Sequence, residues 1–245
     1  GPGGAAGPAS NSMSRAVRVA RERVRVLQVC GAPSMDQKFL RLFLKEDPGV
    51  DLVSFFILRT MEDFGSGYRQ EELSLIEFPY RRLFADDLST FDLVILQNFN
   101  YAPYFEFDVN LLLGNMATYV KEGGALAMIG GDRSFDLGRY AGTPLEEVLP
   151  VKLGLPGDAS DAAPFTPGIT EAGSRHPVTR LDPELTENAQ LWANLPPMDG
   201  INLTNGAVEG AAVLLSHPAR AESPVLAVRQ VGQGRTMALA VDSSW

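Results

Sequence analysis

The sequence has little cysteine and little histidine, with one Cys and two His among 245 residues. A single Cys excludes an intramolecular disulfide and a zinc site built on cysteines. No apolar run approaches the ~18–20 residues of a transmembrane helix, so we do not expect the chain as given to span a membrane. The first residues are small and polar and lack the apolar segment of a signal peptide.

Positive charge is also scarce, since 21 Lys and Arg stand against 30 Asp and Glu, a net charge of −9. This balance argues against a nucleic-acid partner. Five Arg and one Glu lie within residues 15–25, so this segment carries +4 and the rest of the chain −13. It is either a contact for anionic lipid or nucleic acid, or an exposed edge strand in which Arg alternates with Val. The alternation favours the strand.

We interpret residues 1–23 as a tag remnant and a basic lead-in, and residues 24–245 as one domain. Hydrophobic residues make up 45% of the chain, enough for a sizeable core. Short β-branched runs alternate with helical spacing, which predicts an α/β fold with a doubly wound, mostly parallel sheet and helices on both faces. The tail, residues 211–241, is expected to extend this sheet with antiparallel strands. The predicted strands are 24–30, 51–58, 91–97 and 125–129, and the predicted helices 36–46 and 108–121, with a helical turn at 83–88, an aromatic loop at 98–104 and an exposed loop at 154–168.

Ligands of open parallel sheets bind outside the carboxyl ends of the strands. An Asp at such an end is either catalytic or caps a helix, and the sequence leaves both readings open. The glycine pair Gly130-Gly131 follows a buried strand and permits the tight turn found in nucleophile elbows and phosphate-binding turns. The chain lacks both glycine-rich nucleotide motifs, and we expect no cofactor. The candidate ligand-binding residues at these ends are Asp36, Arg59, Asn98, Tyr101, Gly130, Gly131, Asp132, Ser134 and Asp242.

An ordered set of short blocks covers about residues 24–245. Together they resemble the glutamine amidotransferase-like domain of bacterial membrane proteins that also carry von Willebrand factor A domains. The resemblance implies a class I glutamine amidotransferase-like, flavodoxin-like fold. The blocks include residues 30–36 (CGAPSMD), 53–60 (VSFFILRT), 77–79 (EFP), 91–97 (FDLVILQ), 119–124 (YVKEGG), 128–131 (MIGG), 143–145 (TPL), 149–151 (LPV), 176–177 (HP), 195–197 (LPP), 232–235 (GQGR) and 242–245 (DSSW).

The resemblance does not extend to the catalytic triad. A class I amidotransferase needs a nucleophilic Cys on a strand-to-helix elbow, a His that moves the proton and a Glu that orients the His. Gly130 stands at the position of the nucleophile, and residues 242–244 (DSS) stand where the His-x-Glu pair is expected. Cys30 ends the first strand instead, which is typical of a buried structural thiol. His176 and His217 each precede a Pro and are expected in loops, and no neighbouring His could activate Ser134.

Three hypotheses follow from these residues and from the resemblance, which alone implies the membrane-anchored parent protein of the first. The preferred one is a non-catalytic binding or interaction domain, excised from a larger membrane-anchored protein of the cell envelope, whose partner is a protein or a neighbouring domain. The second is a hydrolase or transferase in which Asp36, Asp132 and Asp242 converge on a divalent metal. The third is a small-molecule sensor in which the aromatic loop lines a pocket and Arg59 binds an anionic group.

Overall fold

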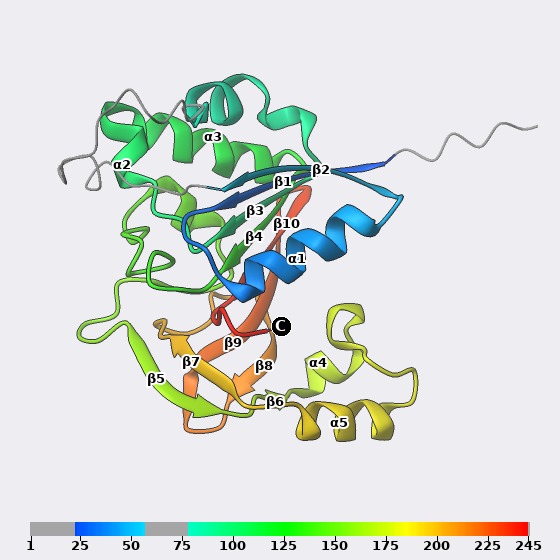
Figure 1. The fold of residues 1–245 in the computed structure, drawn as a ribbon. Coiled ribbons are helices and arrows are strands. Elements are labelled where there is room, and N and C mark those ends of the chain that lie inside the picture. The colour runs from blue at the N-terminus through cyan, green and yellow to red at the C-terminus, as the bar shows by residue number, and fades with distance from the viewer. Residues whose placement is uncertain (1–22, 57–77, 245) are drawn as a thin grey trace, which may run out of the picture.

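The computed structural model describes residues 23–56 and 78–244, which surround one sheet of eight strands (Figure 1). The strand order is β2-β1-β3-β4-β10-β9-β8-β6. The first five strands of that order are mutually parallel, and the last three are antiparallel. The α/β class and the mostly parallel sheet are thus confirmed, as is its antiparallel extension. The strands are β1 (Val24–Cys30), β2 (Val50–Phe56), β3 (Leu93–Gln97), β4 (Ala125–Ile129), β6 (Gly168–Ile169), β8 (Ala212–His217), β9 (Arg220–Val231) and β10 (Gly234–Leu239).

Local sequence explains where helix α1 (Met35–Glu46) begins and ends. The Ser34 hydroxyl accepts a hydrogen bond from the Gln37 amide at 3.0 Å, which satisfies one free donor of the first turn. Pro48 cannot continue the helix, and the Asp47 carboxylate accepts from the Gly49 amide at 2.7 Å in the turn that follows. The chain is thereby returned directly into β2, parallel to β1.

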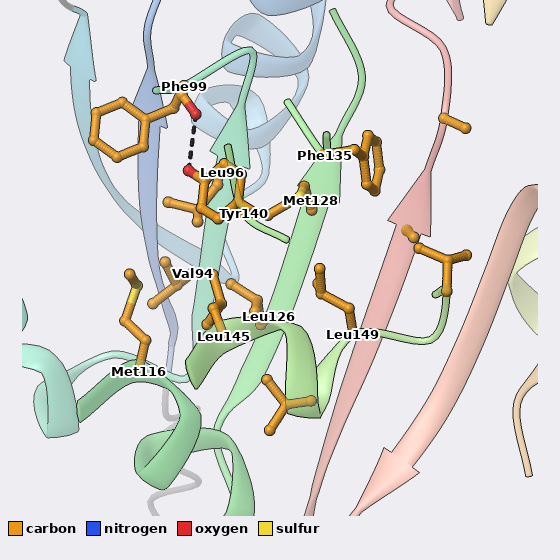
Figure 2. Close-up of a cluster of buried hydrophobic side chains, with 14 of the residues drawn as sticks. Val94, Leu96, Phe99, Met116, Leu126, Met128, Phe135, Tyr140, Leu145 and Leu149 are labelled. Atoms are coloured by element: carbon orange, nitrogen blue, oxygen red, sulfur yellow. Dashed lines mark hydrogen bonds between the residues drawn. The ribbon is translucent and has the colours of Figure 1, made fainter. Parts of the chain in front are cut away.

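Helix α3 (Val109–Lys121) covers one face of the sheet and encloses the main core there. Figure 2 shows Met116 of this helix beside side chains of β3 and β4, with Tyr140 above them. The Tyr140 hydroxyl is fully buried and donates to the Phe99 carbonyl at 2.8 Å. On the opposite face, Leu40 and Leu44 of α1 pack over a smaller apolar cluster of β1, β3 and β4. Helices therefore cover both faces, as the sequence predicts.

Two segments differ from the sequence-based expectation. The aromatic loop contains a short helix, α2 (Ala102–Phe105), and the expected exposed loop at 154–168 contains strand β5 (Ser160–Phe165). Strand β5 (SDAAPF) contains Asp, Ala and Pro, which are poor strand formers, and its pairing with β7 (Met198–Asn202) decides its conformation. Residues 57–77, which include Arg59, lie outside the described residues.

Shorter elements complete the fold. The helical turn predicted at residues 83–88 is confirmed, because η3 and η4 cover this segment. No helix among the described residues is long and apolar enough to cross a membrane. The remaining elements are η3 (Arg82–Asp86), η4 (Leu88–Thr90), η5 (Glu106–Asp108), η6 (Pro144–Val148), α4 (Glu171–Arg175), η7 (Pro177–Thr179) and α5 (Leu185–Asn194).

Candidate functional site

The carboxyl ends of four parallel strands meet at one edge of the sheet. The register places Cys30 beside Gln97, Gln97 beside Ile129, and Ile129 beside Leu239. The candidate residues follow these strand ends in the loops, or in the first turn of α1 for Asp36; Arg59 lies outside the described residues. These strand ends lie side by side, and the arrangement of the side chains around them decides what chemistry is available there.

The turn after β4 is too crowded for a side chain at Gly130. A Cβ atom there would stand 2.7 Å from Oδ1 of Asn202 and 2.8 Å from both the Ala240 carbonyl carbon and the Val241 nitrogen. Ordinary contacts of a Cβ atom begin at about 3.4 Å, and two of these three atoms are backbone. Gly130 thus marks a close approach between the end of β4 and the segment that follows β10, and a nucleophile has no room at this point.

Two asparagine side chains hold the same turn. The Asn202 amide group accepts from the Gly131 nitrogen at 2.8 Å and donates to the Gly131 oxygen at 3.0 Å. Oδ1 of Asn98 accepts from the Arg133 nitrogen at 2.7 Å, and Asn98 itself adopts a positive φ of 46°. Gly131 has a φ of 127°, a conformation that few residues other than Gly adopt. Asn202 is not among the residues predicted from the sequence, because nothing in the sequence marks β7 as a neighbour of this turn.

Asp36 lies at the end of a chain of polar groups that are buried, apart from the half-buried Ser54. The Ser54 hydroxyl donates to Gln28 at 2.9 Å, the Gln28 amide donates to Gln97 at 3.0 Å, and the Gln97 amide donates to Asp36 at 3.4 Å. The other carboxylate oxygen of Asp36 accepts from the Ser244 amide at 3.0 Å and hydroxyl at 2.8 Å. Asp36 thus ties α1 to the residues after β10, which is a structural use of the carboxylate.

Ser134 and Tyr101 are buried and engaged with backbone oxygens. The Ser134 hydroxyl donates to the Ile129 carbonyl at 2.6 Å, which favours the capping of a turn over nucleophilic attack. The Tyr101 hydroxyl donates to the Arg139 carbonyl at 2.7 Å, and its ring lies 5.1 Å from the ring of Tyr140. The described part of the aromatic loop therefore packs into the core.

A cavity of about 290 Å³ opens beside this turn, between the ends of β4 and β10 and the β5–β7 pair. This volume is close to the lower limit for small-molecule pockets. Its walls carry Asp132, Asp161, Asp199 and Asp242. Burial, together with the charges of Asp36, Asp132 and Asp199, raises the pKa of Asp242 above its usual value. Among residues 23–56 and 78–244 no group of three or more His, Cys, Asp and Glu side chains is arranged to hold a metal ion, so the metal hypothesis gains no support.

Cys30 lies buried at the end of β1, and its thiol donates to the Ala32 carbonyl at 2.9 Å. Burial raises its pKa to about 11, although the Arg133 guanidinium nearby lowers it. The neutral thiol is a weak nucleophile, so Cys30 has the environment of a structural cysteine.

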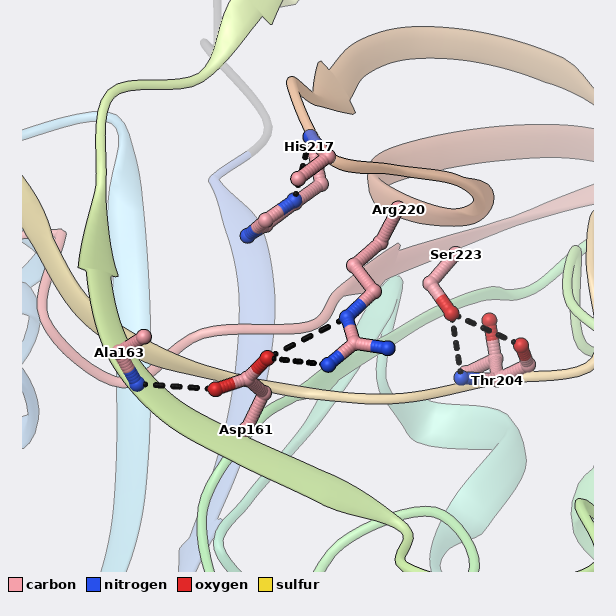
Figure 3. Close-up of polar contacts among 7 residues, drawn as sticks. Asp161, Ala163, Thr204, His217, Arg220 and Ser223 are labelled. Carbon is pink, nitrogen blue, oxygen red and sulfur yellow. Dashed lines mark hydrogen bonds and ion pairs between the residues drawn. The ribbon is translucent and has the colours of Figure 1, made fainter.

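The two histidines serve other parts of the fold. His176 caps η7 by accepting from the Val178 amide at 3.2 Å. His217 ends β8, packs its ring 4.2 Å from that of Phe165 and accepts from the Ala219 amide at 3.1 Å. Figure 3 shows it near the Asp161–Arg220 ion pair. Burial lowers the pKa of His217, the opposite of what a positively charged partner in a triad would require.

Solved structures share this fold. Two are similar over 90% of this chain and 89% of their own length at 20% sequence identity: the Cytoplasmic Protein STM3548 from Salmonella typhimurium, with a TM-score of 0.61, and the Cytoplasmic Protein STM1381 from Salmonella typhimurium LT2, with a TM-score of 0.63. Identity this low shows the fold alone. No curated protein is found to match the chain.

The mostly parallel sheet with helices on both faces is an α/β fold consistent with the flavodoxin-like type. The family model described as "Putative glutamine amidotransferase" matches residues 77–245. The chain belongs to this family, which confirms the resemblance at the level of the domain.

Proposed function

We propose that this chain is a non-catalytic glutamine amidotransferase-like domain that acts as a binding or interaction module of a larger membrane-anchored bacterial protein. The observation that carries the proposal is the closed turn after β4. Backbone atoms of the segment after β10 and the Asn202 amide occupy the space in which a nucleophile at position 130 would stand.

Glutamine hydrolysis needs a thiolate within reach of a base. With a pKa of about 11, the Cys30 thiol is ionised in only about one molecule in 10,000 at pH 7. The thiol is also buried and donates a hydrogen bond to the Ala32 carbonyl. Both properties favour a structural thiol over a relocated nucleophile.

The proposed cell-envelope setting and the proposed partner are supported by the family resemblance and by the net charge of the chain. The anchored parent protein rests on the resemblance to domains that accompany von Willebrand factor A domains. A protein partner or a neighbouring domain fits a chain whose net charge of −9 disfavours nucleic acid. The polar chain that ends at Asp36 holds the carboxyl edge in one arrangement, as a rigid recognition module requires.

The test is a glutaminase assay with a coupled readout of glutamate and ammonia. Wild type and Cys30→Ala are compared at pH 7 and pH 9, with thermal unfolding of both as a control for folding. We expect no ammonia above the protein-free blank at either pH. Release of ammonia that disappears in folded Cys30→Ala would overturn the proposal, and release that persists in Cys30→Ala would show a catalytic site elsewhere and overturn it equally.

A further inference from the structure

A further cavity, of about 620 Å³, lies at the edge of the sheet opposite the candidate site. It is lined by the amino ends of β3, β4 and β10 and by the last two turns of α3, and residues of η3 and η4 close its other side. This volume falls within the range of small-molecule sites. The strands separate this cavity from the Gly130 turn, so a ligand bound here does not depend on the proposed function.

The cavity exists because the middle one of three strand starts carries no side chain. The register places Ala125 of β4 between the first residue of β3 and Arg235 of β10. A Cβ atom at Gly124, directly before this start, would collide with the ring of Tyr119 in α3. Position 124 therefore has to be Gly, and a hollow remains between Asp92, which precedes β3, and Arg235.

The two flanks of this hollow carry opposite charge. One carboxylate oxygen of Asp92 accepts from the backbone N–H of Arg25 at 2.7 Å, and the other has no partner among the described residues. Arg235, on the other flank, takes part in none of the ion pairs found among residues 23–56 and 78–244. The two side chains begin two strand spacings apart, which is about 10 Å.

Helix α3 adds negative charge and hydrogen-bond acceptors to the cavity. The helix ends at Lys121 and points its partial negative end at this edge, and the exposed Glu122 follows as its C-cap. The Asn115 amide group donates to the Phe84 carbonyl at 3.1 Å, which leaves its oxygen as an acceptor. These groups favour an ammonium group in the ligand, whereas the single guanidinium of Arg235 favours an anionic group.

We propose that this cavity binds a short peptide with free ends, its ammonium group toward Asp92 and Glu122 and its carboxylate on Arg235. A zwitterion matches walls of both signs, whereas a ligand with charge of one sign only would bring like charges together on one flank. An extended chain spans about 3.3–3.6 Å per residue, so a tripeptide reaches across the hollow of about 10 Å. Arg binds a carboxylate through two parallel hydrogen bonds, which fixes the direction of the peptide.

The test is isothermal titration of the whole chain with trialanine, N-acetyl-trialanine and trialanine amide, the last two of which each lack one terminal charge. The variants are Arg235→Gln and Asp92→Asn, and Asn retains an acceptor for the backbone N–H of Arg25. The matched controls are Asp158→Asn and Arg180→Gln, which remove exposed charges of the same kinds outside the cavity. Thermal unfolding verifies that each variant folds.

We expect wild type and both controls to bind trialanine, more weakly at high salt. Loss of one exposed ion pair should weaken binding about fivefold, whether the peptide end is blocked or its partner is replaced. Asp92→Asn should no longer distinguish trialanine from the acetylated peptide, and Arg235→Gln should no longer distinguish it from the peptide amide.

Absence of trialanine binding by wild type, or binding that both cavity variants retain in full, would overturn the proposal. Equal affinity for all three peptides would do the same, as would an equal loss in the two controls, which would show a general effect of charge. Binding of butylamine or of acetate as tight as that of trialanine would assign the cavity to a ligand with charge of one sign. The glutaminase result concerns the opposite edge and has no bearing on any of these outcomes.

Discussion

The closed turn at Gly130 makes a quantitative prediction for the substitution Gly130→Ala. The added Cβ would lie about 0.6–0.7 Å inside ordinary contact distance of three atoms, two of which belong to the backbone of Ala240 and Val241. That backbone is held in place, because the Ala240 carbonyl accepts a hydrogen bond from the backbone N–H of Asn202 at 2.7 Å. The substitution Asn202→Ala leaves this bond intact. We therefore expect a cost of about 3 kcal/mol, at the upper end of the range for overpacking.

Urea unfolding of wild type and Gly130→Ala measures this cost, and thermal unfolding should show a Tm lower by about 6–12 °C. The matched control is Gly114→Ala in α3, where a Cβ meets nothing within 4 Å. That substitution should stabilise the helix by about 0.5–1 kcal/mol. The change from Gly to Ala is thus expected to lower the free energy of unfolding at position 130 and to raise it at position 114.

The double variant Gly130→Ala with Asn202→Ala separates the two sources of crowding. It removes the Asn202 oxygen but leaves both backbone atoms, so we expect the cost of the Gly130 substitution to persist for the most part. If Gly130→Ala alone lies within about 0.5 kcal/mol of wild type while Gly114→Ala behaves as expected, the turn accommodates a side chain. The main support for a non-catalytic site would then be lost.

Three further predictions concern single side chains. Asn202→Ala should cost about 2 kcal/mol in urea unfolding, because Gly131 loses two hydrogen bonds; the exposed Asn205→Ala serves as control and should be nearly neutral. The Cys30 thiol should resist iodoacetamide at pH 8 in the folded protein and react readily in denaturant, because its pKa is about 11 and it is buried; rapid labelling of the native state would contradict this. Burial lowers the pKa of His217 from 6.5, so below pH 6.5 the unfolded state binds more protons than the folded state and the free energy of unfolding should fall. Urea titrations from pH 7 to pH 5 should show a smaller fall in His217→Gln than in wild type.

The sequence by itself determined the class of the fold and the edge at which a site would lie. Runs such as residues 93–96 are apolar on both faces, as is typical of a central parallel strand that helices cover on both sides. The Gly pair after β4 and the absence of a Cys and a His-x-Glu pair at the expected positions were also plain from the residues. Local periodicity and residue identity carry this information, since they do not depend on distant parts of the chain.

Only the tertiary structure decided how the apolar and polar side chains are used. Helical spacing groups Phe39, Leu40, Phe43 and Leu44, yet the sheet takes the two leucines and leaves the two phenylalanines exposed. Strand β5 forms because β7 lies beside it, and β7 brings Asn202 to a turn 71 residues away in sequence. These outcomes depend on contacts between distant segments, which no local pattern encodes. That is why the sequence could show that position 130 lacks a nucleophile, whereas the fold shows that its place is filled.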